Sequence, residues 1–168
     1  MVIVLMGVSG AGKTTVGQLL ASELGWNFAD GDDYHSPANV EKMRSGIPLT
    51  DADRAPWLET LRALIATWIA AGKNTVLACS ALKQSYRQCL RAGSGVEVKI
   101  VYLKATPEVL QQRLRERRGH FMTERLLASQ LATLEAPEGA VTVDADRSPA
   151  EIVIEIRARL ALPEQIVH

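Results

Sequence analysis

The residues from Gly7 to Thr15 have the types and the spacing of a phosphate-binding loop. They contain the pattern Gly-x-x-x-x-Gly-Lys-Thr, which runs from Gly7 through Gly12 to Lys13 and Thr14. Glycines let the backbone curl so that several N–H groups face one anion, the lysine adds a positive charge, and the hydroxyl can bind Mg²⁺. A glycine-rich turn that only begins a helix requires neither the lysine nor the threonine. The loop therefore predicts a bound nucleoside triphosphate with Mg²⁺.

Such a loop needs a strand before it and a helix after it, and the sequence supplies both. Five short apolar runs predict strands, and segments of helical periodicity lie between them. The runs are Val2–Met6, Trp26–Ala29, Thr75–Cys79, Val98–Leu103 and Ala140–Val143. Strands that alternate with helices indicate a parallel sheet with right-handed crossovers. We therefore expect an α/β, three-layer fold with a five-stranded parallel sheet and with ligands at its carboxyl edge. With the phosphate loop after the first strand, we interpret it as a P-loop NTPase fold and take the strand order to be 2-3-1-4-5.

Several helix starts are marked by their side chains. Three hydroxyl residues each precede a proline, a pair that is typical of an N-cap followed by the first helical residue. These pairs are Ser36-Pro37, Thr106-Pro107 and Ser148-Pro149. Thr50 with Asp53, and Ser148 with Glu151, have the spacing of a capping box. Helices are therefore expected to begin at these four places.

Length and composition indicate one domain over residues 1–168, because 168 residues with 47% hydrophobic content can bury one sizeable core. Lys and Arg total 19, as do Asp and Glu, so no net positive charge favours nucleic acid or an anionic membrane. The longest apolar stretch, Ala63–Ala71, is far shorter than the roughly 20 residues of a membrane helix. Cys79 and Cys89 fit no metal-ligand spacing, and the N-terminus carries no basic leader. We expect a cytoplasmic protein with reduced thiols.

Two positions offer the acid that commonly helps to hold Mg²⁺ beside a phosphate loop. Asp144 follows the last apolar run, whereas Asp30 and Asp32 follow the second. We favour the second position, because in this strand order strand 2 lies on the acceptor side and Asp144 falls in a loop near the nucleotide base. Asp30 is then expected to bind Mg²⁺ through water, and Asp32 to bind an acceptor hydroxyl and accept its proton. The alternative is a solvated acidic turn.

Residues 113–118 read Arg-Leu-Arg-Glu-Arg-Arg, a dense group of positive charges. Arg113 and Arg117 are four residues apart and are expected to share one helical face. Such a cluster repels itself unless an anion binds, and a lid that closes over ATP supplies one. We expect a helical lid over approximately residues 113–130, in which Arg113 binds ATP and Arg117 is catalytic. A solvated basic helix face is the alternative.

The expected nucleotide-binding set is therefore the phosphate loop together with one arginine of the lid. Lys13 is expected to be catalytic as well as ATP-binding, because it can reach the transferring phosphate. Thr14 is expected to bind Mg²⁺. The complete set is Gly7, Val8, Ser9, Gly10, Ala11, Gly12, Lys13, Thr14, Thr15 and Arg113.

Four blocks of the sequence resemble the gluconokinase family of small P-loop carbohydrate kinases. The blocks are Asp30–Leu58, Cys79–Arg91, Arg117–Met122 and Ser129–Pro137, and the first is far more specific than the phosphate loop. The resemblance runs over nearly the whole chain. It implies ATP-dependent phosphorylation of D-gluconate at its terminal hydroxyl, giving 6-phospho-D-gluconate and ADP. It also implies a parallel sheet with a lid and a homodimer. Related shikimate and adenylate-type kinases share the fold but lack the first block.

An acceptor such as gluconate needs a cation for its carboxylate and several hydrogen-bonding groups for its hydroxyls. The candidate cations are Arg54, Lys83 and Arg87, with His35 as a hydroxyl partner. Lys83 and Arg87 are four apart near the start of a predicted helix, and arginine binds a carboxylate bidentately, which favours Arg54 or Arg87 for that contact. Each of these cations has a surface charge as its alternative. Trp57 is interpreted as a core or dimer-face residue.

Two other functions are compatible with the same residues. One is another small-molecule kinase of this fold, acting on shikimate, a nucleotide or a different sugar acid. The other is a nucleotide-binding regulator that closes its lid on ATP to control a partner. The acidic block argues against the regulator, because a regulator needs no general base beside the γ-phosphate.

Overall fold

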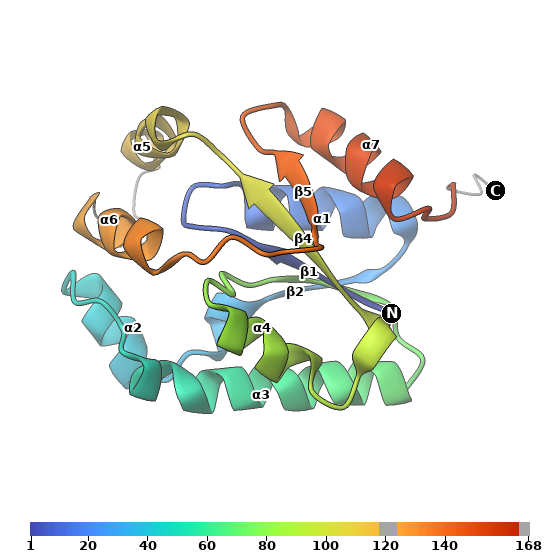
Figure 1. The fold of residues 1–168 in the computed structure, drawn as a ribbon, viewed down its shortest axis with the longest axis horizontal. Coiled ribbons are helices and arrows are strands. Elements are labelled where there is room, and N and C mark those ends of the chain that lie inside the picture. Colours follow the sequence, from blue (N-terminus) through green and yellow to red (C-terminus); the bar gives the residue numbers. More distant parts are fainter. Residues whose placement is uncertain (118–123, 165–168) are drawn as a thin grey trace.

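The computed structural model describes residues 1–117 and 124–164, and a five-stranded parallel sheet forms its centre (Figure 1). The strand order β2-β3-β1-β4-β5 confirms the prediction. The strands are β1 (Val2–Met6), β2 (Asn27–Asp30), β3 (Thr75–Ala78), β4 (Val98–Lys104) and β5 (Val141–Asp144). Each boundary lies within one residue of the apolar run that predicted it. The strands β2 and β5 each end one residue later than predicted, at an aspartate, because the prediction counted only apolar residues.

Helices cover both faces of this sheet, which confirms the three-layer arrangement. They are α1 (Lys13–Leu24), α2 (Pro37–Arg44), α3 (Asp51–Ala70), α4 (Gln84–Arg91), α5 (Pro107–Glu116), α6 (Glu124–Thr133) and α7 (Pro149–Arg159), with short 3₁₀ turns η1 (Gly31–Tyr34) and η2 (Gly95–Glu97). Figure 1 shows α1 and α7 on one side of the sheet and α3 and α4 on the other. None of the described helices is both long enough and apolar enough to cross a bilayer.

The alternation of β1 explains why two separate cores form. Successive side chains of a strand point to opposite faces of the sheet. Ile3 and Leu5 pack with α1, α5 and α7, whereas Val4 and Met6 pack with α3 and α4. All residues of β1 are fully buried. This strand therefore fixes the position of the phosphate loop, which follows it directly.

The predicted helix starts are confirmed. The hydroxyls of Ser36, Thr106 and Ser148 each accept a hydrogen bond from the backbone three residues on, and a proline follows each one. Thr50 with Asp53, and Ser148 with its glutamate, form complete capping boxes. These local hydrogen bonds satisfy backbone N–H groups that a helix leaves unpaired, so they need no distant partner.

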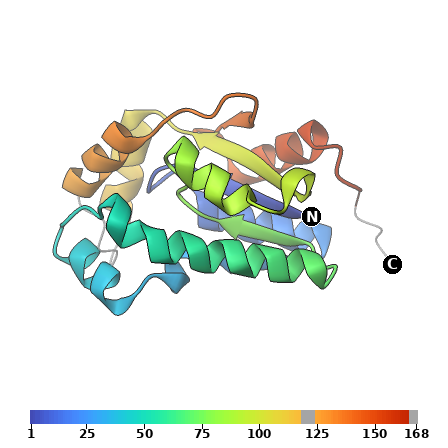
Figure 2. The ribbon, with the colours of Figure 1, turned by 60° about the horizontal axis from the view of Figure 1, so that its bottom comes forward.

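The carboxyl ends of the strands meet at the end of the molecule that α2, α5 and α6 occupy (Figure 2). Met43 of α2, Leu49 and Leu126 of α6 form a small buried cluster at this end. The cluster joins the acidic block to α6, two segments that are far apart in the sequence. Apolar burial thus closes one side of the sheet edge at which ligands are expected.

The segment expected as a lid, approximately residues 113–130, divides between two helices. Residues 113–116 belong to α5, whose Leu110 and Leu114 lie in the main core, and residues 124–130 belong to α6. Residues 118–123 lie outside the described part. The prediction that Arg113 and Arg117 share a helical face was wrong, because α5 ends at Glu116 and Arg117 has an extended backbone with ψ 109°.

Candidate active site

The phosphate loop lies between the end of β1 and the first turn of α1, as predicted. Gly12 precedes α1 with φ 92°, in the left-handed region that glycine adopts without a side-chain clash. The Gly7 amide donates to the Ser80 carbonyl at 3.2 Å and ties the loop to the end of β3. Nζ of Lys13 donates to the carbonyls of Gly7 at 2.9 Å and Val8 at 3.0 Å. The ammonium group therefore spans the loop on which the phosphates are expected.

Lys13 is held in an environment that favours anion binding. Burial lowers the pKa of Lys13 below its ordinary value of 10.5, and the charges of Asp32 and Asp30 oppose this shift. A cation that has lost part of its water gains more from a bound anion than an exposed cation does. The helix N-terminus beside it adds partial positive charge at the same place. The arrangement suits the phosphates of a nucleotide.

Thr14 and Asp30 meet where β2 ends beside the first turn of α1. Oγ1 of Thr14 donates to Oδ2 of Asp30 at 2.8 Å, and Oδ1 of the same carboxylate accepts from the Asp32 amide at 3.0 Å. Gly31 packs so closely on β3 that a Cβ would lie 2.9 Å from the Ala78 carbonyl oxygen. Only glycine permits this approach, so Gly31 lets the acidic turn pack against the end of β3.

The oxygen atoms of Thr14 and Asp30 fit the preference of Mg²⁺ for hard ligands. Among the described residues, no group of three or more His, Cys, Asp or Glu side chains could hold a metal ion on its own. Mg²⁺ commonly takes one or two protein oxygens and completes its shell with water and substrate phosphates. The pair therefore suits an ion that arrives with the nucleotide. Asp144, the alternative acid, is the last residue of β5, and its Oδ1 accepts from the Asp146 amide of the following loop at 2.9 Å.

Trp57 holds the acidic turn in place. Its Nε1–H donates to the Gly31 carbonyl at 2.7 Å in the interior, and its ring stacks on His35 with ring centroids 4.2 Å apart. Nδ2 of Asn39 lies 3.4 Å from Nδ1 of His35. Burial, and then the nearby charge of Arg54, lower the pKa of His35 to about 4. His35 is therefore neutral at pH 7 and can serve as a hydrogen-bonding group but not as a cation.

A pocket opens beside Lys13 and brings together three of the predicted acceptor residues, Asp32, His35 and Arg54. Oδ1 of Asp32 lies 3.9 Å from Nε2 of His35. The pocket combines a carboxylate, a neutral imidazole, a guanidinium and an ammonium, a set that suits a small anion with hydroxyl groups. Its lining consists of Ser9, Lys13, Asp32, His35, Met43, Pro48, Leu49, Arg54, Trp57, Ser80, Leu82, Leu126, Ser129 and Gln130.

The other two predicted cations point elsewhere. Nζ of Lys83 pairs with both carboxylate oxygens of Asp51, at 3.0 and 3.1 Å. Arg87 is buried and its guanidinium donates to the carbonyls of Ala81, Leu82 and Glu135. The spacing of Lys83 and Arg87 correctly placed both at the start of α4. It could not predict where their side chains point, because that depends on the hydrogen-bond partners given above. Neither Lys83 nor Arg87 lines the acceptor pocket, so we leave both out of the function proposed below.

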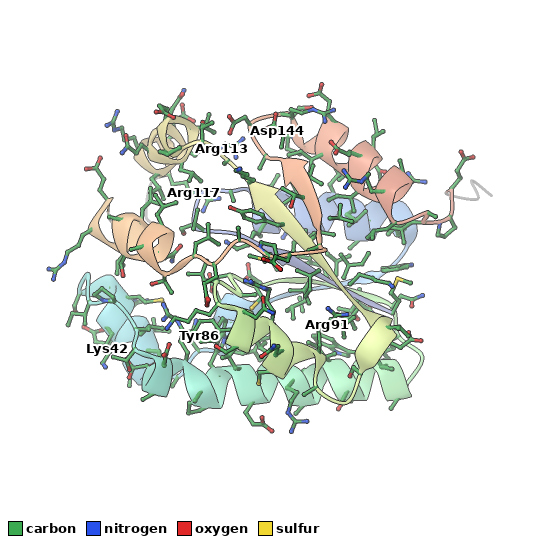
Figure 3. All side chains as sticks on the ribbon, in the orientation of Figure 1. Lys42, Tyr86, Arg91, Arg113, Arg117 and Asp144 are labelled. Carbon is green, nitrogen blue, oxygen red and sulfur yellow. The ribbon has the colours of Figure 1, made fainter. Side chains whose placement is uncertain are left out.

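A second pocket adjoins the phosphate loop through different residues and contains both predicted lid arginines. Nη1 of Arg113 donates to the Gly10 carbonyl at 3.1 Å, and its Nη2 donates to the Ala145 carbonyl at 2.7 Å. Arg113 thus joins the phosphate loop to the loop after β5. Arg117 is exposed and lines the same pocket, and Figure 3 shows both arginines between α5 and the carboxyl edge of the sheet. The other lining residues are Gly10, Ala11, Gly12, Thr15, Val16, Glu116, Arg147, Pro149 and Ile152.

Sequence reasoning missed the contact between α6 and the phosphate loop. The Ser9 amide donates to Oε1 of Gln130 at 2.7 Å, and Ser129 lines the same pocket. Both residues begin the last of the family-like blocks, which is the signal that could have identified them. Trp57 is buried in the core, as one of its two interpretations expected, and it also lines the acceptor pocket, which sequence reasoning did not indicate.

Comparison with known proteins agrees with this geometry. The sequence family described as "AAA domain" matches residues 2–137. A gluconokinase from Gluconobacter oxydans is 50% identical over 156 residues, which cover 91% of this chain and 86% of that protein. The chain belongs to the gluconokinase family. The structure of a gluconokinase from Sinorhizobium meliloti 1021 has 47% identity and a TM-score of 0.83, covering 95% of this chain and 90% of that chain. The unliganded structure of a sugar kinase from Janibacter sp. HTCC2649 has 43% identity and a TM-score of 0.90, covering 96% of this chain and 94% of that chain.

Proposed function

We propose that this member of the gluconokinase family transfers the γ-phosphoryl group of ATP to the terminal hydroxyl of D-gluconate, giving 6-phospho-D-gluconate and ADP. The similarity to gluconokinases over most of the chain supports the reaction. The observation that carries the residue assignment is the single pocket that Lys13, Asp32, His35 and Arg54 line together. A sugar acid supplies both the carboxylate and the hydroxyls that such a pocket would bind.

The acceptor half of the reaction belongs to three side chains. Arg54 binds the gluconate carboxylate, because among the pocket-lining residues it is the cation that does not belong to the phosphate loop. His35, being neutral, exchanges hydrogen bonds with the chain hydroxyls. Asp32 accepts the proton of the terminal hydroxyl as the oxygen attacks the γ-phosphorus. The bond between that phosphorus and the β–γ bridging oxygen breaks, and ADP leaves with the electron pair.

The donor half belongs to the phosphate loop and to two arginines. Lys13 and the loop amides hold the β- and γ-phosphates, and Arg113 and Arg117 add positive charge where charge builds up during transfer. Thr14, and Asp30 through water, would hold Mg²⁺, which neutralises phosphate charge when it is bound. Phosphoryl transfer depends on positioning and charge stabilisation, so no covalent phosphoenzyme is expected.

Three further properties belong to the same proposal. The enzyme is a homodimer, which the family resemblance suggests and which sedimentation measurements would test. The lid over ATP remains a prediction for approximately residues 113–130, of which residues 118–123 lie outside the part of the chain that the structure describes. ATP as the donor and two free cysteines, Cys79 and Cys89, support a cytoplasmic location.

The reaction is tested by ADP release in a coupled assay with D-gluconate, shikimate, D-glucose, AMP or no acceptor, with the product identified by phosphorus NMR. We expect gluconate-dependent ADP release and a phosphomonoester on the terminal carbon. Asp32→Asn should lower kcat by about 10²–10⁴ with little change in the KM for ATP. Asp33→Asn, a change to an exposed acid of the same turn, is the matched control and should retain normal turnover.

Each other result would change the proposal in a defined way. Preference for shikimate, glucose or AMP would show a different small-molecule kinase on the same fold. Tight ATP binding without turnover on any acceptor would favour a regulator. Full turnover by Asp32→Asn would remove Asp32 as the base while leaving the reaction intact.

A further inference from the structure

The guanidinium of Arg54 is held by a second residue that does not touch the acceptor pocket. Nη1 of Arg54 donates to the Tyr86 hydroxyl at 3.3 Å, and Cζ of Arg54 lies 5.6 Å from the centre of the Tyr86 ring. Arg54 lies in the first turn of α3 and Tyr86 in the first turn of α4, two helices that pack together. Figure 3 shows Tyr86 at the end of α4 that is nearer to α2. Tyr86 is 5% exposed and is not among the residues that line the pocket.

The Tyr86 hydroxyl is oriented by a carboxylate. It donates to Oδ1 of Asp51, so its oxygen lone pairs remain for the guanidinium of Arg54. Burial, and then the hydrogen bond to Asp51, raise the pKa of Tyr86 above its ordinary value, so the phenol keeps its proton at neutral pH. The hydrogen bonds therefore run in one direction: the Arg54 guanidinium donates to the Tyr86 hydroxyl, and the hydroxyl donates to the Asp51 carboxylate.

Lys83 completes the cluster through Asp51. Its ammonium pairs with both oxygens of Asp51, and Nζ lies 5.7 Å from the centre of the Tyr86 ring. Lys83 is thus the ion-pair partner of Asp51, and Asp51 does not form an ion pair with Arg54. The positive charge of Arg54 remains available to an anion in the pocket. This arrangement gives Lys83 an indirect role in place of the direct substrate contact expected from the sequence.

We infer that Tyr86, oriented by Asp51, is a positioning residue that fixes the Arg54 guanidinium toward the carboxylate of the acceptor. The inference rests on the proposed function. An arginine side chain loses considerable rotamer freedom when it binds a ligand, and a guanidinium that is already held loses less. Because the contact is remote from the phosphoryl group, its loss weakens binding of the ground state and of the transition state alike. The effect therefore belongs to the KM for gluconate and not to kcat.

The test is a double-mutant cycle of Tyr86→Phe and Arg54→Ala, measured as kcat and as KM for gluconate and for ATP. Tyr86→Phe keeps the buried ring and removes only the hydroxyl. We expect it to raise the KM for gluconate about tenfold, the effect of one hydrogen bond to a charged group, with kcat and the KM for ATP within about twofold of normal. In the Arg54→Ala background the same change should alter the KM for gluconate by less than about twofold, because its target is gone.

Tyr102→Phe is the matched control, because Tyr102 lies in β4 and its ring belongs to the same buried cluster as Tyr86. It should leave the KM for gluconate unchanged. Equal tenfold effects of Tyr86→Phe with and without Arg54 would overturn the inference, as would a normal KM in Tyr86→Phe. If Tyr86→Phe does not fold, the cycle of Asp51→Ala with Arg54→Ala decides instead. The Asp51 side chain is 66% exposed, and its removal should raise the KM for gluconate only in the presence of Arg54.

Assays of the unchanged protein distinguish a failure of the proposed function from a failure of the positioning role of Tyr86. If the unchanged protein releases ADP in a gluconate-dependent way but the effects of Tyr86→Phe and Arg54→Ala on the KM are additive, only the positioning role of Tyr86 is overturned. Absence of gluconate-dependent turnover in the unchanged protein would overturn the proposed function and the positioning role together.

Discussion

Replacing Arg87 with methionine is expected to destabilise the fold and to leave substrate affinity nearly unchanged. The Arg87 guanidinium donates to the carbonyls of Ala81 at 2.8 Å, Leu82 at 3.0 Å and Glu135 at 2.9 Å. Two of these carbonyls follow β3 and the third follows α6, so one side chain joins two distant segments beside the acceptor pocket. Arg87 itself is 6% exposed. Methionine can fill the space but cannot donate a hydrogen bond.

The size of the effect follows from these contacts. A hydrogen bond from a charged donor contributes about 1.5–3 kcal/mol net, so three of them set an upper bound of about 4.5–9 kcal/mol. Bonds that share one donor group are not additive, and the Glu135 carbonyl is only partly buried. We therefore expect a loss of about 3 kcal/mol in the free energy of unfolding. For a domain of this size that loss lowers Tm by about 6–12 °C.

Urea and thermal unfolding followed by circular dichroism would measure this change, with steady-state kinetics on the same samples. Arg91→Met is the control, because Arg91 is an exposed arginine at the end of the same helix, and it should shift the free energy of unfolding by less than about 0.5 kcal/mol. Unfolding of Arg87→Met at the normal urea concentration, with the KM for gluconate raised tenfold or more, would refute the reasoning and return Arg87 to the substrate site.

Two further predictions concern the acidic turn and its stacked imidazole. Trp57→Phe removes the 2.7 Å hydrogen bond to the buried Gly31 carbonyl, so the free energy of unfolding should fall by about 1–3 kcal/mol and kcat should fall with it; urea unfolding and turnover measure both. Because burial lowers the pKa of His35 from 6.5 to about 4, the unfolded chain takes up a proton below pH 6.5 that the folded chain does not. Stability should therefore decline as the pH falls from about 6.5 to about 4, and this decline should be smaller in His35→Gln when urea unfolding is repeated at each pH.

Both predictions have a result that would contradict them. Trp68→Phe changes a tryptophan of the same helix that is only partly buried, and equal losses in Trp57→Phe and Trp68→Phe would show that the Gly31 contact contributes nothing. The same pH dependence in His35→Gln as in the unchanged protein would show that His35 titrates normally in the folded state. An NMR titration of the imidazole would decide the second point directly, since His35 should not take up a proton between pH 8 and pH 5.5.

The elements themselves could be predicted because their signals are local. The β1 strand is fully apolar over five residues, and the hydroxyl–proline pairs that begin α2, α5 and α7 find their hydrogen-bond partners within three residues. The phosphate loop depends on glycines and on the helix that follows, all within nine residues. These interactions join residues that are close together in the sequence, so a single sequence is sufficient to predict them.

The directions of long side chains could not be predicted in the same way. Lys83 and Arg87 lie one turn apart as expected, but Asp51 of α3 and the Glu135 carbonyl lie 32 and 48 residues away along the chain and determine where these cations point. Arg54 remains in the pocket because Tyr86 is near it, a contact between residues 32 positions apart. A charged group turns toward whichever partners the packed helices bring close to it.

By itself, the sequence determined the extents of the strands, the helix starts, the phosphate loop and the acidic turn, because glycine spacing, capping pairs and apolar runs act over a few residues. The tertiary structure alone decided that Trp57 supports the acidic turn, that Gln130 contacts the Ser9 amide from 121 residues away, and that Arg87 is a structural clamp. These contacts form only when separate segments pack against one another. Their partners are therefore fixed by three-dimensional proximity and are not encoded in any local pattern.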